Sequence, residues 1–219
     1  MLPLFQWWHM NHKVSIYLSG SIKKGHESGS FWTNDEIDAL RKYLSEYEIS
    51  FLNPAFRSDD LSDQRSVFGR DMTQVFCSDV VFVDARDRRG LGVGAEMMWA
   101  KVHKIPIVTL APKETHYHKS KTTLLDVAVE NWVHPFVESL SDAVVENLLE
   151  GASWIRKFTS TSPPKVKDIE SIQSAMQYYR DNQLAHDEPM RALIQANPKL
   201  HHQIWRVKKE EQELTFSSK

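Results

Sequence analysis

Cysteine is nearly absent from this chain of 219 residues, in which Cys77 is the only one. A single cysteine excludes an intramolecular disulfide framework and a cysteine-rich zinc site, and it favours a reducing, cytoplasmic compartment. No apolar run approaches the roughly 20 residues that span a bilayer, so we expect no membrane segment. The formal net charge of −2 argues against an overall electrostatic grip on nucleic acid.

The chain also lacks the residue spacing of a metal site. It has ten histidines, but His116 and His118 alternate and His201 and His202 are adjacent. Neither pair has the i, i+4 spacing of a helical zinc site. We therefore expect no metal. Hydrophobic residues make up 41% of the chain and charged residues 26%, which is the composition of an ordinary globular protein.

What the sequence does contain is an alternation of short apolar runs with helix-length amphipathic segments. The predicted strands are Val14–Ser19, Ile49–Leu52, Val80–Val83, Ile105–Leu110 and Trp132–Val133. The predicted helices are Asn34–Tyr47, Gln64–Phe76, a segment from Gly92 through Ala100, Leu124–Val129 and Ser141–Phe158. Such alternation implies right-handed βαβ units. It predicts an α/β fold, a flavodoxin-like doubly wound and mainly parallel sheet of about five strands.

A polar segment divides the chain in two. Residues Thr159–Pro164 read Thr-Ser-Thr-Ser-Pro-Pro, the composition of a linker. We therefore expect an α/β domain over residues 1–158, and a linker with a helical extension over residues 159–219. The helix-prone part, Ile169–Leu214, is expected to pack on the domain or on a second subunit.

Two loops have the position of a ligand site, because ligands of open α/β sheets bind where the strands end. The first follows the strand Val14–Ser19 and runs through Gly20, Ser21, Ile22 and Lys23. Its small residues let the backbone approach a ligand, its serine offers a hydroxyl, and its lysine can meet an anion. Taken alone, a glycine–serine turn after a strand is more often only a turn.

The second loop leads into a helix through Gly90, Gly92, Gly94 and Glu96. It is not a dinucleotide fingerprint, which would need glycine in place of Met97, and no P-loop lysine follows. What remains is a helix N-terminus with open amides, which suits phosphate. Glu96 is expected in the first turn, where the helix field favours its ionised form. It is either a capping carboxylate or a carboxylate of the site.

Two charged segments adjoin these loops. Arg70-Asp71-Met72 precedes the apolar strand Val80–Val83, and Asp71 by itself reads as an ordinary solvated helix residue. The arginines at 86, 88 and 89 either steer an anionic ligand or form a solvated face.

The order of these segments is similar to a known family. Ile16–Ile22, Arg70–Met72, Ser78–Val83 and Leu91–Glu96 together resemble the nucleoside 2-deoxyribosyltransferase superfamily, and most of all its 5′-nucleotide (2′-deoxynucleoside 5′-phosphate) N-hydrolase branch. The resemblance spans roughly residues 14–134. It implies a flavodoxin-like homodimer, or a higher homo-oligomer, whose sites lie near the subunit contacts. It also implies cleavage or exchange of an N-glycosidic bond through a glutamate nucleophile, with no cofactor.

The resemblance assigns roles by position. It implies Glu96 as the nucleophile, Asp71 as the carboxylate at the sugar and base, and Tyr17 as the aromatic residue beside the sugar. Gly20, Ser21, Ile22 and Lys23 match the first substrate loop, and Gly92 and Gly94 match the amides around a 5′-phosphate. Where the hydrolase branch usually has a serine, this chain has Gly90, and Arg89 or Lys23 is the candidate substitute.

The leading hypothesis is therefore an N-glycosidase that hydrolyses a nucleoside 5′-monophosphate to free base and sugar 5-phosphate. A carboxylate near C1′ would stabilise the oxocarbenium-like transition state or attack it. One alternative is a deoxyribosyltransferase that exchanges bases. The other is a sensing module that binds a nucleotide without cutting it. The expected partner is a small nucleotide, without nucleic acid or membrane.

Overall fold

The computed structural model describes residues 12–20, 32–160 and 163–205. The chain divides into two compact units, Met1–Ile169 and Glu170–Lys219, and each is described by itself. Within the described residues, no helix is both long enough and apolar enough to cross a membrane.

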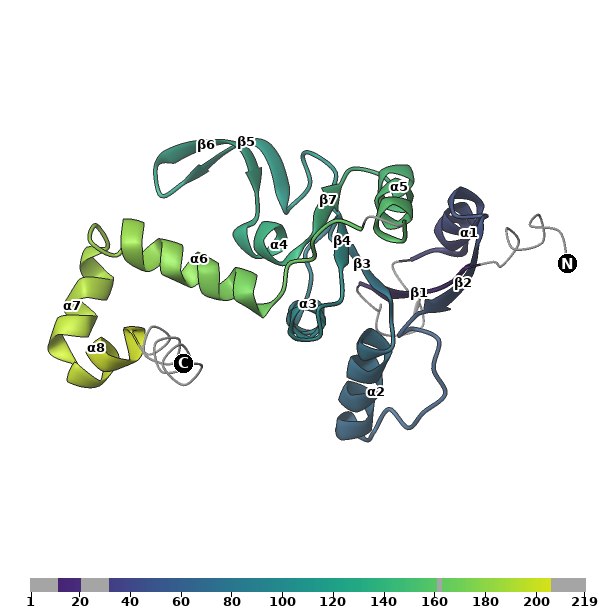
Figure 1. Ribbon diagram of the computed structural model, residues 1–219, viewed down its shortest axis with the longest axis horizontal. Coiled ribbons are helices and arrows are strands. Elements are labelled where there is room, and N and C mark those ends of the chain that lie inside the picture. The colour runs from purple at the N-terminus through teal and green to yellow at the C-terminus, as the bar shows by residue number, and fades with distance from the viewer. Residues whose placement is uncertain (1–11, 21–31, 161–162, 206–219) are drawn as a thin grey trace, which may run out of the picture. The chain divides into compact units, whose positions relative to one another are not determined.

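The first unit is built on a parallel sheet (Figure 1). In the described part of the chain its five strands lie in the order β2-β1-β3-β4-β7, and every neighbouring pair is parallel. Their bounds are β1 His12–Ser19, β2 Tyr47–Leu52, β3 Val80–Asp84, β4 Ile107–Leu110 and β7 Ala143–Val145. The order reverses beside β1, as it does in flavodoxin-like folds. The predicted fold class is confirmed.

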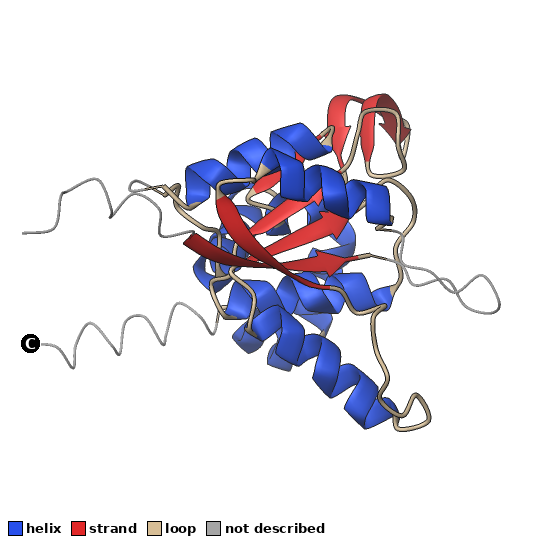
Figure 2. Cartoon of the chain, turned by 90° about the vertical axis from the view of Figure 1, so that its right-hand side faces the viewer, coloured by secondary structure: helices blue, strands red, loops and turns tan. Residues whose placement is uncertain are grey.

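Helices cover both faces of this sheet (Figure 2). One face carries α1 (Asn34–Tyr43) and α5 (Leu148–Phe158), and the other carries α2 (Gln64–Phe76) and α3 (Leu91–Val102). Because both faces are covered, β3 is buried along its whole length. Thr33 caps α1 in a capping box with Glu36.

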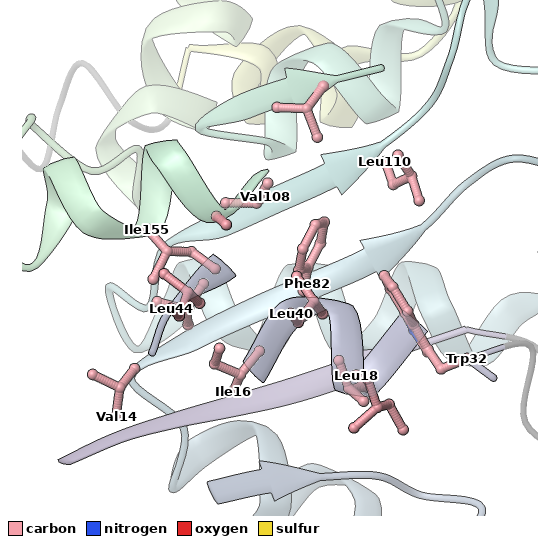
Figure 3. Packing of buried hydrophobic residues seen from close by; sticks show 14 residues of the cluster. Val14, Ile16, Leu18, Trp32, Leu40, Leu44, Phe82, Val108, Leu110 and Ile155 are labelled. Atoms are coloured by element: carbon pink, nitrogen blue, oxygen red, sulfur yellow. The ribbon is translucent and has the colours of Figure 1, made fainter. Parts of the chain in front are cut away.

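A hydrophobic core cluster lies on the α1 and α5 face. Every second residue of β1, namely Val14, Ile16 and Leu18, packs there with Leu40 and Phe82 (Figure 3). Side chains alternate along a strand. The residues between them, including Tyr17 and Ser19, therefore point to the opposite face, where α2 and α3 lie. This alternation places the chemistry of β1 on the face away from the main core.

Two predicted elements between β4 and α5 are wrong. The expected helix Leu124–Val129 is the tip of an antiparallel hairpin of β5 (His118–Leu124) and β6 (Val127–Val133). Its two loop residues, Leu125 and Asp126, have φ values of 45° and 67°. The β-branched Thr and Val residues on either side favour strands, and a two-residue loop with positive φ closes a hairpin.

The fifth strand of the sheet was also misplaced. Trp132–Val133 ends β6, whereas Ala143–Val145 is the strand that pairs with β4. The predicted helix over Ser141–Phe158 therefore begins only at Leu148, where the Asn147 side chain accepts a hydrogen bond from the Glu150 amide. A short helix, α4 (Pro135–Leu140), precedes β7 and was not predicted. The helix predicted over Asn34–Tyr47 ends at Tyr43, because Tyr47 already belongs to β2.

The second unit is helical in its described part. It contains α7 (Glu188–Ala196), α8 (Pro198–Ile204) and all of α6 (Ile169–Asn182) except its first residue. The buried Arg180 donates to the Ile204 carbonyl across 3.2 Å, which ties α6 to the end of α8.

Candidate active site

The side chain of Glu96 is held between two hydroxyl groups of β1. The Tyr17 hydroxyl donates to Glu96 Oε1 across 3.0 Å, and Ser19 Oγ donates to Oε2 across 2.5 Å. Tyr17 and Ser19 reach the same carboxyl group because they are two residues apart on one strand face. Glu96 is only 7% exposed. It is therefore neither a solvated residue nor a capping carboxylate.

Burial dominates the electrostatics of this carboxyl group. Removal from water raises the pKa of Glu96, the hydrogen bonds from Ser19 and Tyr17 lower it, and the charge of Asp71 raises it again. The expectation that Glu96 stands in the first turn, ionised by the helix field, is wrong. The helix begins at Leu91 and has no acidic residue in its first turn, and the helix field falls off beyond that turn.

Tyr17 is a fully buried donor. Burial raises its pKa far above the ordinary value, and the charges of Glu96 and Asp71 add to this effect. Its hydroxyl therefore stays protonated across the physiological range. It can serve only to hold the glutamate or to donate to a ligand.

Asp71 lies on α2 and belongs to the same electrostatic cluster, since its charge raises the pKa values of both Glu96 and Tyr17. Burial raises the pKa of Asp71 itself, and the neighbouring Arg57 and Arg70 oppose that shift. Arg57 Nη1 lies 3.2 Å from Asp71 Oδ1 and Arg70 Nη1 lies 3.6 Å from the same oxygen. The three side chains that the sequence named as catalytic thus come together.

The loop that follows β1 is described only at its start, Gly20. A Cβ atom on Gly20 would lie 3.5 Å from the Trp32 ring and 3.6 Å from Asp84 Cβ, which is ordinary contact. Trp32 Nε1 also donates to the Ser19 carbonyl across 3.0 Å. The loop thus leaves β1 between an aromatic ring and a carboxylate. Ser21, Ile22 and Lys23 lie outside the described residues.

The glycine segment opens α3. Gly90 is its N-cap, and within the described residues no side chain caps this helix end. A Cβ atom on Gly92 would lie 4.0 Å from Glu96 Oε1, whereas one on Gly90 or Gly94 would meet nothing within 4 Å. Gly92 therefore borders the glutamate, and the first amides of the helix are not occupied by a capping side chain.

The side chain of Arg89 is buried in an ion pair with Asp84, so its charge is already compensated within the protein. Its side chain is 4% exposed, and its Nη2 atom lies 2.8 Å from Asp84 Oδ2. The Asp84 carboxylate therefore compensates the charge of Arg89. Arg86 Nε lies 2.9 Å from the other carboxylate oxygen of the same aspartate.

Sequence reasoning missed three residues of this neighbourhood. Ser19 and Asp84 are the last residues of β1 and β3 and are fully buried. A polar residue that ends a buried parallel strand was the signal that could have found both. Arg57 lies in the loop between β2 and α2, and no motif marks it.

A mostly apolar pocket of about 600 Å³ lies beside α3. Its lining includes Arg89, Gly90 and Gly94 at the start of α3, together with Phe136 of α4 and Tyr117. Glu96, Tyr17 and Asp71 do not line it. Within the described residues, no group of three or more His, Cys, Asp or Glu side chains could hold a metal ion.

Comparisons with known proteins give no family model and no curated protein that matches the chain. Among solved structures, a conserved protein from Enterococcus faecalis V583 shares 18% identity at a TM-score of 0.49 and covers 66% of this chain and 98% of its own. A 2-deoxyribosyltransferase from Bacillus psychrosaccharolyticus shares 12% identity at a TM-score of 0.42, covering 63% and 90%. One from Leishmania mexicana shares 15% at 0.38, covering 78% and 99%. These likenesses are too distant to decide the chemistry.

Proposed function

We propose that this protein is an enzyme that cleaves the N-glycosidic bond of a nucleoside 5′-monophosphate, releasing the base. One observation carries the proposal. A glutamate on α3, almost fully buried, accepts hydrogen bonds from Tyr17 and Ser19 at the carboxyl end of β1, the strand beside which the sheet order reverses. Ligands of doubly wound sheets bind at this place. A buried carboxylate with a raised pKa is typical of a functional site.

The chemistry follows from a carboxylate at C1′. Ionised Glu96 attacks C1′, the bond between C1′ and the base nitrogen breaks, and its electron pair leaves with the base, which takes up a proton. Water then attacks C1′ of the glycosyl ester, restores the carboxylate and loses a proton. Burial strips water from the carboxylate and so makes it a better nucleophile. Asp71 either holds the sugar hydroxyls or protonates the base.

The open amides at the start of α3 are the proposed phosphate site. Gly90, Gly92 and Gly94 offer little side-chain bulk there, and a helix N-terminus favours an anion. Ser21, Ile22 and Lys23, which lie outside the described residues, are proposed as further substrate-binding residues. Arg89 would act from its ion pair with Asp84. We further propose that the enzyme works in the cytoplasm, consistent with its single cysteine.

A second copy of the chain is the partner that the family resemblance implies. The β5–β6 hairpin stands largely exposed, with Leu125 at its tip 98% exposed. A lone two-stranded hairpin is marginally stable in water. We propose that the hairpin and the exposed side chain of Phe136 pack against the second copy.

The test is base release from a panel of nucleosides and their 5′-monophosphates, with and without a second free base. Release from monophosphates alone supports hydrolysis. Exchange that requires an added base supports a transferase, and tight binding without turnover supports a sensor. Glu96→Gln should lose about three or more orders of magnitude in turnover, because catalytic groups that act as a unit cost that much. Glu138→Gln, at an exposed position on α4, is the matched control. Full activity of Glu96→Gln refutes the proposed mechanism.

A further inference from the structure

Four charged side chains form a closed group where the loop after β2 meets α2. Arg57 and Asp59 come from the loop, and Arg70 and Asp71 come from the helix. Arg57 Nε donates to Asp59 Oδ1 across 2.9 Å, and its Nη2 donates to Asp59 Oδ2 across 2.5 Å. One edge of the guanidinium is thus fully used by Asp59, in the bidentate geometry that fixes an arginine most firmly.

The bidentate pair aims the remaining nitrogen of Arg57. Its Nη1 donates to Asp71 Oδ1 across 3.2 Å, and the Arg57 side chain is only 9% exposed. Arg70 is held from another side, because its Nη2 donates to the Phe56 carbonyl across 2.6 Å. Arg70 Nη1 is 3.6 Å from Asp71, a longer contact than that of Arg57. Arg57 is therefore the principal partner of Asp71.

The charges of these four side chains balance, and this affects the protonation of Asp71. Two arginines and two aspartates compensate one another, so Asp71 can stay charged although it is half-buried. Among the described residues, Glu96 on α3 and Tyr17 on β1 are two further titratable groups whose pKa values the charge of Asp71 raises. Without Arg57, two aspartates would share Arg70 alone, close to the glutamate.

We propose that Arg57, fixed by Asp59, is a positioning residue that holds Asp71 as a charged hydrogen-bond acceptor for the substrate rather than as a proton donor. This inference rests on the proposed function, and it chooses between the two roles left open for Asp71. A charged Asp71 accepts hydrogen bonds from sugar hydroxyls or from an N–H group of the base. The proton for the leaving base must then come from elsewhere, with solvent water as the simplest source.

Burial holds the pKa of Asp71 above its ordinary value, and the charges of Arg57 and Arg70, in that order, limit this rise. The ion pair with Arg57 is thus what opposes protonation of Asp71. An opposite charge within about 4–6 Å lowers a carboxyl pKa by about 1–3 units. Loss of Arg57 should therefore leave Asp71 protonated at a higher pH than in the native protein.

The experiment follows the Asp71 carboxyl by carbon NMR during a pH titration of the full chain, with Asp71→Asn used to assign the signal. In Arg57→Gln the titration should move to higher pH, and kcat/KM for base release at pH 6 should fall at least about tenfold. Arg57→Lys keeps the charge and should restore most of the native titration. Arg65→Gln removes the same charge from an exposed position on α2 and should change neither quantity.

The outcomes separate this inference from the proposed function. If the Asp71 titration is the same in Arg57→Gln as in the native protein, the inference is overturned, whatever the activity. If the native protein releases no base from any substrate, the proposed function fails, while the titration still decides whether Arg57 keeps Asp71 charged. If Arg57→Gln does not fold, as judged by circular dichroism, the comparison of Arg57→Lys with Asp59→Asn decides. The inference holds if Asp59→Asn moves the Asp71 titration to higher pH, against the downward shift that loss of the Asp59 charge alone would cause, while Arg57→Lys leaves it near the native position, and it fails otherwise.

Discussion

Removal of the Tyr17 hydroxyl should move the pH dependence of catalysis in a defined direction. Tyr17→Phe keeps the buried ring but deletes the group that donates to Glu96 Oε1 across 3.0 Å. That hydrogen bond lowers the pKa of Glu96 against the larger effect of burial. Its loss leaves the ionised carboxylate less stabilised, so Glu96 should ionise only at a higher pH.

The size of the effect follows from the type of bond. A hydrogen bond to a charged group contributes about 1.5–3 kcal/mol. One pH unit corresponds to about 1.4 kcal/mol, so the acidic limb of kcat/KM should move upward by about one to two units. At a pH on that limb the rate falls by roughly tenfold to a hundredfold, whereas on the alkaline side of the limb it returns toward the native value. Ser19 Oγ still donates to Oε2, which keeps the carboxyl group in place.

The assay is kcat/KM for base release measured between about pH 5 and pH 9. Tyr43→Phe is the control, because Tyr43 is a half-buried tyrosine of α1 that packs against the core on the opposite face of the sheet. Its limb should stay in the native position. An acidic limb that is unmoved in Tyr17→Phe, or that moves to lower pH, would refute the view that this hydroxyl stabilises the ionised glutamate.

Four further results are expected. Burial holds the pKa of Glu96 in the folded state above its ordinary value, so the folded protein loses stability as the pH rises through the folded-state pKa. The Tm of Glu96→Gln should therefore exceed that of the native protein at pH 8 but not at pH 4. A difference in Tm that does not widen with pH contradicts this. Gly151→Ala should cost about 1–3 kcal/mol in urea unfolding, because its Cβ would lie 2.4 Å from the Phe82 ring. Gly69→Ala, in α2 with nothing within 4 Å, should instead gain about 0.5–1 kcal/mol, and a loss there contradicts the reasoning. Phe136→Glu should halve the mass found by sedimentation equilibrium, and a native protein that is already monomeric refutes the proposed dimer.

Much of the first unit could be predicted because the local pattern and the tertiary structure agree. Gln64–Phe76 was predicted with the bounds that α2 has, and the apolar run Val80–Val83 is the core of β3. A run of four buried apolar residues can form a central parallel strand, since both faces are covered.

The hairpin and β7 could not be predicted in the same way. The segment at Leu124–Val129 contains five aliphatic side chains that fit a helix or a strand equally well, and only pairing between β5 and β6 decides between them. Ala143–Val145 is too short to carry a periodic signal of its own. Its identity as a strand comes from the hydrogen bonds that it makes with β4.

The candidate site shows the same division between local and tertiary information. The family resemblance singled out Glu96, Asp71 and Tyr17, but the protonation of these side chains depends on groups that the resemblance does not include. Ser19 donates to Glu96 because it lies two residues after Tyr17 on the same face of β1. Arg57 donates to Asp71 because the loop that carries it folds back onto α2. Sequence order can name the carboxylates of a site, whereas only the fold determines how burial and charge distribute protons among them.

The alternation of β1 also separates stability from chemistry. Val14, Ile16 and Leu18 face the hydrophobic cluster under α1 and α5, while Tyr17 and Ser19 face the carboxyl group on α3. A strand covered on both faces can contribute its apolar residues to a well-packed core and hold hydroxyl groups in fixed positions on the other side. The buried carboxyl group raises the free energy of the folded state, and the core on the opposite face offsets that cost.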